Sequence, residues 1–103
     1  MKTFGIVLIC IILFGSFSLA LAAGDASKGK ILFNDTKIGG ANAGSSCNSC
    51  HPGGKGLEKA GARKDLPEVI NACIETALKG KPLSPKSPEM ADLVAYVKSL
   101  GRK

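Results

Sequence analysis

Two cysteines and a histidine stand close together in the segment SSCNSCHPGG, residues 45–54. Cys47 and Cys50 are separated by two residues, and His51, the only histidine of the chain, follows directly. Cysteines at positions i and i+3 project from one side of a helical turn, so both sulfurs can reach the two vinyl groups on one porphyrin edge. The adjacent imidazole is then placed to bind the iron. The pattern predicts one covalently bound haem c, with Cys47 and Cys50 as its thioether residues and His51 as its proximal axial ligand.

Other chemistry for two thiols and an imidazole fits the sequence less well. A structural zinc site needs four ligands, usually from two separated pairs, and only Cys73 remains to assist. A thioredoxin-type pair lies in a strand–helix–strand setting, for which there is no pattern here. A plain disulfide leaves His51 without a role. Because that histidine would be used by iron, the sequence offers no general base, and we expect no enzyme.

The N-terminal segment predicts export. After Lys2, residues 3–24 carry no charge, and small residues gather around Ala22. A basic start, an apolar stretch and a small-residue cleavage site form a secretory signal peptide. We expect residues 1–22 to be removed and one domain, residues 23–103, to remain in the periplasm. Left uncleaved, the segment would instead anchor the protein in a membrane, because its apolar run is long enough to span one.

The chain that remains is small and poor in aromatic residues. It keeps one phenylalanine, Phe33, and one tyrosine, and it has no tryptophan. Such a chain buries only a thin core on its own. Its three cysteines, an odd number, cannot all pair within one exported chain. A covalent haem would supply both the missing core and a use for the sulfur.

The best marked helix of the sequence covers residues 65–80 and carries Cys73. Asp65 is the predicted N-cap, Glu68 completes a capping box, and Gly80 ends the helix. Apolar residues of helical period form a stripe along it, namely Val69, Ile70, Cys73, Ile74, Ala77 and Leu78.

Two further helices are predicted near the ends of the domain. The first covers residues 24–35 with Asp25 as N-cap, and the second runs from Ser87, its N-cap, through Pro88 to Gly101. Their apolar contacts come from Ile31, Leu32 and Phe33 in the first and from Met90, Leu93, Val94, Val97 and Leu100 in the second. The segments between them are rich in glycine, serine and proline, and no run alternates as a strand does. The sequence predicts a compact all-α domain of about three helices wrapped around the haem.

The motif and its flanking helices resemble the small class I monohaem c-type cytochromes, over essentially the whole chain after the signal. Residues 25–35 are similar to the N-terminal helix of that family, in which a glycine and an aromatic, here Gly29 and Phe33, pack against the C-terminal helix. Residues 91–100 are similar to that last helix, with Tyr96 in the usual aromatic place. The resemblance implies a cytochrome c-like fold and a periplasmic carrier that shuttles single electrons between redox proteins.

The sixth iron ligand has two candidates. In the class I family it is usually a methionine in the loop before the last helix, but residues 79–88 contain none. Met90 is the only methionine after the signal and equally fits a core position. Residues 70–100 resemble the stretch after the haem motif in thiosulfate dehydrogenases and related sulfur-oxidation cytochromes, where a cysteine binds iron as thiolate. That resemblance makes Cys73 the preferred sixth ligand and Met90 the alternative. An inert buried thiol or an intermolecular disulfide at Cys73 also stays open.

The lysines of the chain bear on its partners, and the identity of the sixth iron ligand bears on its alternative functions. Six lysines flank the motif and the last linker, at positions 55, 59, 64, 79, 81 and 86. They form either a docking rim for acidic redox partners or simply a solvated surface. Nucleic acid is not expected, because stacking aromatics are absent. Alternative functions are a haem-based sensor or small-ligand binder, and a haem subunit of a sulfur-oxidising system with cysteine-ligated iron.

Overall fold

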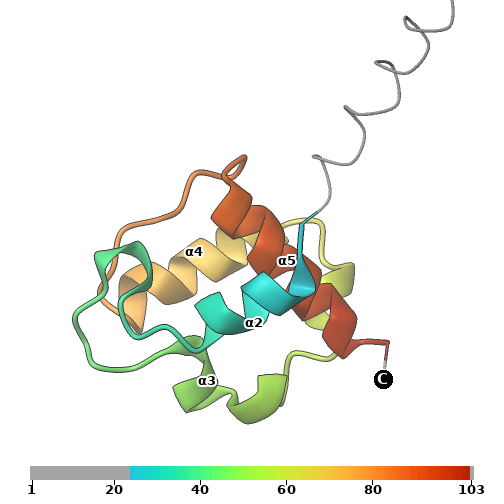
Figure 1. Ribbon diagram of the computed structural model, residues 1–103, viewed down its shortest axis with the longest axis horizontal. Coiled ribbons are helices and arrows are strands. Elements are labelled where there is room, and N and C mark those ends of the chain that lie inside the picture. Colours follow the sequence, from blue (N-terminus) through green and yellow to red (C-terminus); the bar gives the residue numbers. More distant parts are fainter. Residues whose placement is uncertain (1–23, 103) are drawn as a thin grey trace, which may run out of the picture.

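The computed structural model describes residues 24–102, so the predicted signal peptide over residues 1–22 lies outside the described part. The described residues form helices, turns and loops without a strand, which confirms the all-α prediction. The α-helices are α2 (Ala26–Phe33), α3 (Cys47–Cys50), α4 (Leu66–Thr76) and α5 (Pro88–Leu100), and the short 3-10 helices are η2 (Ile38–Gly40), η3 (Pro52–Gly54) and η4 (Ala60–Ala62) (Figure 1). Between residues 24 and 102, every helix is too short or too polar to cross a membrane.

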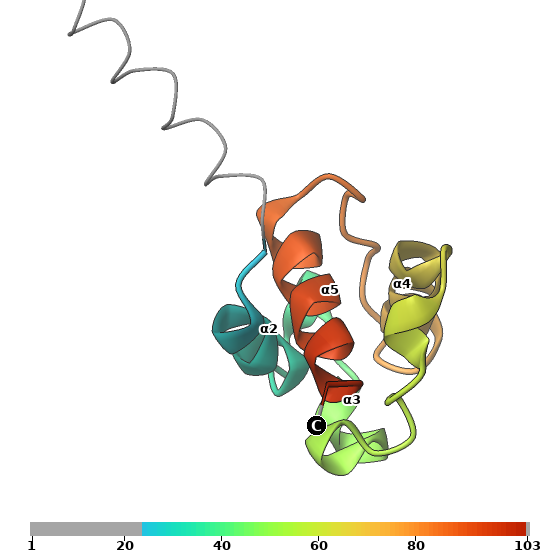
Figure 2. The same ribbon diagram turned by 90° about the vertical axis from the view of Figure 1, so that its right-hand side faces the viewer.

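Helix α5 lies at the centre of the arrangement. Turned by 90°, the ribbon shows α5 between α2 and α4, with α3 near the end of α5 (Figure 2). Its core-facing residues explain this central place, because Leu93, Tyr96 and Leu100 all belong to the buried core. These side chains recur every three or four residues and therefore form one continuous helical stripe.

Helices α2 and α5 cross at very close range. Gly29 lies at the crossing, where an added Cβ would overlap the backbone oxygen of Asp92 and lie 2.8 Å from Tyr96 Cβ. One turn further on, the ring of Phe33 packs on Tyr96, with centroids 5.1 Å apart and planes tilted by 56°. Tilted pairs of this kind are favoured by the charge distribution of aromatic rings. The predicted packing of Gly29 and Phe33 on the C-terminal helix is therefore present.

The predicted N-caps of α2 and α5 are confirmed. The Asp25 carboxylate accepts hydrogen bonds from the backbone N–H groups of residues 27 and 28, at 2.8 and 3.3 Å. The N–H of Asp25 in turn donates to Asp92 Oδ1 at 2.8 Å, which ties the start of α2 to α5. Ser87 Oγ accepts from the N–H of Met90 at 3.2 Å. Each cap satisfies helix-end donors that would otherwise lack a partner.

The predicted capping box of α4 is wrong. Asp65 does occupy the N-cap position, but its side chain makes no capping hydrogen bond. Its carboxylate instead accepts two bonds from Arg63, from Nε at 2.8 Å and from Nη2 at 2.9 Å. The hydrogen-bonded guanidinium holds the pKa of the Asp65 carboxyl below its usual range. A paired, charge-assisted contact to a near neighbour competes with the cap for the same oxygens.

The predicted end of α4 at Gly80 is also wrong. The helix ends at Thr76, and the residue that reverses the chain is Lys79, whose φ of 60° is in the left-handed region that glycine usually fills. The Gly80 N–H then donates to the Ile74 carbonyl at 2.9 Å. Gly80 is needed for close approach instead, since an added Cβ would lie 2.9 Å from the backbone oxygen of Ile38.

The segment before the C-x-x-C-H motif is fastened beside the end of α4. The Lys81 N–H donates to the Gly39 carbonyl at 2.8 Å, and the Ala43 N–H donates to the Leu78 carbonyl at 3.3 Å. These two contacts join parts of the chain that are far apart in sequence. They place the approach to α3 next to the helix that carries Cys73.

One expected apolar contact of α2 is absent. Ile31 is 70% exposed, whereas Phe33 is buried. Gly29 and Phe33 are four residues apart and share the face of α2 that meets α5, so Ile31, midway between them, lies on the opposite face. The buried core cluster comprises Phe33, Ile38, Ala41, Cys47, Ile74, Leu78, Leu93, Tyr96 and Leu100.

Candidate functional site

The C-x-x-C-H motif forms one short helical turn, α3, as its spacing predicts. Ser46 and Ser49 cap this turn reciprocally, with the Ser46 N–H donating to Ser49 Oγ at 2.9 Å. The His51 N–H donates to the Cys47 carbonyl at 2.9 Å and closes the turn. The turn thus fixes the backbone of all three chemistry-bearing residues of the motif.

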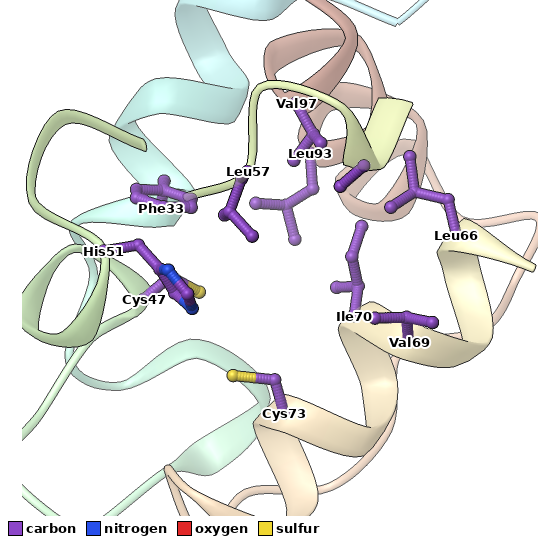
Figure 3. A pocket seen from close by; sticks show the side chains of 11 residues that line it. Phe33, Cys47, His51, Leu57, Leu66, Val69, Ile70, Cys73, Leu93 and Val97 are labelled. Carbon is purple, nitrogen blue, oxygen red and sulfur yellow. The ribbon is translucent and has the colours of Figure 1, made fainter. Parts of the chain in front are cut away.

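An apolar pocket lies between α3, α4 and α5, and Cys47, His51 and Cys73 line it together (Figure 3). The empty space inside it and at its mouth is about 540 Å³. Every other lining side chain is apolar, namely Phe33, Leu57, Ala60, Leu66, Val69, Ile70, Leu93 and Val97. Val69 is 39% exposed, so the wall reaches the surface there. The pocket therefore offers two sulfurs and one imidazole in an otherwise apolar enclosure.

The two cysteines of the motif differ in their surroundings. Cys47 is 8% exposed and lines the pocket, whereas Cys50 is exposed and does not line it. Burial raises the pKa of the Cys47 thiol to about 11, with smaller contributions from the Cys73 and Cys50 thiols. Cys47, Cys50 and Cys73 are all free thiols. None of the three cysteine sulfurs between residues 24 and 102 is in a disulfide, so each could form a bond to a cofactor.

The imidazole of His51 is oriented by a backbone carbonyl. Its Nδ1 lies 3.0 Å from the carbonyl oxygen of Lys55. Because a carbonyl only accepts hydrogen bonds, the proton of the neutral ring belongs on Nδ1, and Nε2 keeps its lone pair. This is the arrangement by which proteins fix the tautomer of a metal-binding histidine. Nε2 is therefore the ring nitrogen through which His51 could hold a metal.

The loop after His51 turns back sharply to bring the Lys55 carbonyl within reach. Gly53, Gly54 and Gly56 have φ values of 62°, 82° and 91°, a region in which side chains are strained. Asn48 Oδ1 accepts a hydrogen bond from the Gly53 N–H at 2.8 Å and holds the turn against α3. The glycines of the sequence HPGGKG thus serve the orientation of the imidazole.

Cys73 faces the motif from across the pocket. It is half-buried on α4, and its sulfur points into the pocket toward the side that carries Cys47 and His51 (Figure 3). Burial raises the pKa of the Cys73 thiol, and the nearby Cys50 thiol adds to that effect. The preferred sixth-ligand candidate therefore shares one pocket with the predicted proximal ligand.

Met90 lies apart from this pocket. It is 1% exposed and packed at the start of α5, but it is not one of the lining residues. The part of α5 that lines the pocket, Leu93 and Val97, begins nearly one turn further along the helix. The position of Met90 is that of a core side chain.

Several pocket residues were not identified from the sequence as site residues. The helical period of α4 predicted an apolar stripe that includes Val69 and Ile70, but it predicted neither a shared cavity nor a role for Leu66, which precedes the stripe. Leu57 and Ala60 come from the basic loop between α3 and α4, where isolated apolar residues give no periodic pattern. The Lys55 carbonyl is a backbone group, and only the run of glycines around it indicated an unusual turn.

The residues present suit a covalently held, largely apolar metallocofactor. Two thiols one turn apart, an imidazole with Nε2 free and an apolar wall are the kinds of group that a haem c would use, with Cys47 inside the pocket and Cys50 outside its lining. Within residues 24–102, no three His, Cys, Asp or Glu side chains gather as a metal-ion site. Comparison with known proteins gives no match to a family model, a curated protein or a solved structure.

Proposed function

We propose that this protein is an exported monohaem c-type cytochrome that carries single electrons between redox proteins. In this proposal residues 23–103 form one cytochrome c-like domain, in which Cys47 and Cys50 bind haem c and His51 binds its iron. The observation that carries the proposal is the His51 imidazole, which the Lys55 carbonyl orients within an apolar pocket shared with Cys47. The bound haem would supply one-electron chemistry at its iron.

The residues of the chain would bind, orient and shield this cofactor. The α3 turn holds the two thiols, and the loop through Lys55 holds the imidazole. The apolar walls from α4 and α5 exclude water, which sets the dielectric environment of the iron and so influences its reduction potential. The half-exposed Val69 marks the side of the wall nearest to solvent, where electrons would enter and leave.

Cys73 is the proposed sixth ligand. Its sulfur faces the His51 side of the pocket, whereas Met90 lies outside the lining. A thiolate is anionic and stabilises ferric iron, so it lowers the reduction potential relative to a thioether ligand. The proposal therefore describes a low-potential carrier.

Electron transfer would involve partners with acidic docking surfaces. All six lysines that flank the motif and the last linker are exposed, namely Lys55, Lys59, Lys64, Lys79, Lys81 and Lys86. Lys59 directly precedes Ala60, which lines the pocket. Positive charge beside a redox site raises the rate of encounter with acidic proteins.

Stopped-flow electron exchange between the purified protein and c-type partners tests the carrier function directly. Failure to exchange electrons with any of them would overturn the carrier proposal.

The ligand set is tested by electron paramagnetic resonance of the ferric protein, recorded beside Cys73→Ala and Met90→Ala. We expect a thiolate-type low-spin signal that disappears in Cys73→Ala and persists in Met90→Ala. The reduction potential of Cys73→Ala should rise by on the order of 100 mV, because an anionic ligand has been removed. A histidine–methionine signal that is lost in Met90→Ala alone would refute ligation by Cys73.

A further inference from the structure

Asn71 ties α4 to the linker that follows it. Its side-chain Nδ2–H donates to the Leu83 carbonyl at 2.8 Å, and the Leu83 N–H donates to Asn71 Oδ1 at 2.8 Å. Both bonds are partly buried and join residues twelve positions apart. The linker returns beside α4 before it enters α5 (Figure 2). One side chain therefore satisfies both backbone groups of Leu83.

This tie lies next to Cys73. Asn71 precedes Cys73 by two residues, in the middle of α4. Packing holds the helix on both sides of this point, since Leu66 at its start, Ile74 beside Cys73 and Leu78 just after its end are buried. The other side-chain hydrogen bond described on α4, from Thr76 to the Ala72 carbonyl, stays within the helix. Among the side-chain hydrogen bonds described on α4, the Asn71–Leu83 pair is thus the one that ties the helix near Cys73 to another segment of the chain.

We propose that Asn71 is a positioning residue, which holds α4 so that Cys73 stays opposite His51 and keeps the sixth iron position closed to small ligands. The inference rests on the proposed function. Without the amide, the Leu83 N–H and carbonyl lose their protein partner, and water that takes its place no longer ties the linker to α4. The fraction of molecules in which Cys73 has left the iron then increases.

The test compares ferric wild-type holoprotein with Asn71→Ala by two readouts. The first is the share of the thiolate-type signal in electron paramagnetic resonance, and the second is the apparent affinity for cyanide. Apparent affinity scales with the fraction of molecules whose binding site is open. We expect a roughly tenfold gain in cyanide affinity, which is the order of effect that loss of one or two hydrogen bonds produces. Wild-type behaviour of Asn71→Ala in both readouts would overturn the inference.

Asp92→Ala is the matched control. It removes another single side-chain partner of a backbone N–H, that of Asp25, at the crossing of α2 and α5. It should lower stability without changing the signal or the cyanide affinity. An equal gain in cyanide affinity in both variants would mean general loosening and would refute a positioning role.

The experiment also distinguishes a failure of the Asn71 role from a failure of the proposed ligation by Cys73, and a second variant covers poor accumulation of Asn71→Ala. If Asn71→Ala does not accumulate, Asn71→Asp retains the acceptor for the Leu83 N–H but loses the donor to the Leu83 carbonyl, so it should still show a gain, and no gain there counts against the inference. A wild-type protein with bound haem but no thiolate signal would contradict ligation by Cys73, and the role of Asn71 would fall with it. A thiolate signal that Asn71→Ala leaves intact would contradict the role of Asn71 alone.

Discussion

Replacing both Cys47 and Cys50 by serine is expected to abolish covalent haem attachment completely. A thioether bond needs the sulfur atom, and a serine hydroxyl in the same α3 turn cannot replace it. Within residues 24–102 the remaining thiol is Cys73, which lies on α4 across the pocket from the motif. Haem-dependent staining of the protein after denaturing electrophoresis measures the loss, because only covalently held haem survives unfolding.

Cys73→Ser is the matched control for the double variant. It also exchanges a thiol for a hydroxyl, but it leaves the α3 turn intact. We expect its haem to remain covalent while its axial coordination changes. Haem that stays attached to the Cys47→Ser, Cys50→Ser protein after unfolding would contradict the assigned roles of these two residues.

The second large effect is expected at the helix crossing, where Gly29→Ala should destabilise the domain by roughly 3 kcal/mol, at the upper end of typical overpacking costs. The new Cβ would overlap the backbone oxygen of Asp92, and a backbone atom of α5 cannot turn aside as a side chain can. Alanine gains about 1 kcal/mol in helix propensity over glycine, which is too little to compensate. A domain of this size has a free energy of unfolding of about 4–12 kcal/mol, so the loss is a large part of it.

Urea unfolding followed by circular dichroism measures this loss. Lys30→Ala, at an exposed position of the same helix, is the control and should stay within about 0.5 kcal/mol of wild type. A Gly29→Ala protein as stable as wild type would mean that α2 and α5 do not need their close contact.

Local features of the sequence predicted those parts of the fold that depend on neighbouring residues. The Asp25 and Ser87 caps and the α3 turn each involve groups within three or four positions, and all three are present. The cap of α4 was mispredicted because Arg63, two residues away, binds the Asp65 carboxylate. The end of α4 was mispredicted because Gly80 is required for a close approach to the backbone near Ile38, which is distant in sequence, and not for ending the helix.

The candidate site likewise has one part that neighbouring residues predict and another part that depends on distant ones. The types and spacing of Cys47, Cys50 and His51 can be read from five consecutive residues. The sequence left two candidates for the sixth ligand, since periodicity places both Cys73 and Met90 on apolar faces. Only the tertiary arrangement of α4 and α5 separates them, because Cys73 lines the pocket, whereas Met90 is buried at the start of α5 outside the lining. The pocket walls at Leu57 and Ala60 depend on tertiary contacts in the same way.

The crossing of α2 and α5 also bears on the order in which the domain can fold during synthesis. A polypeptide is made with its N-terminal part first, so α2 emerges before α5 exists. Gly29 and Phe33 then have no partner until Tyr96, within the last helix of 13 residues, has followed. Contacts between the two ends of a chain are among the last that it can form. The pocket wall that Leu93 and Val97 supply is therefore among the last parts of the domain to form, and Cys47 stays accessible until α5 has been made.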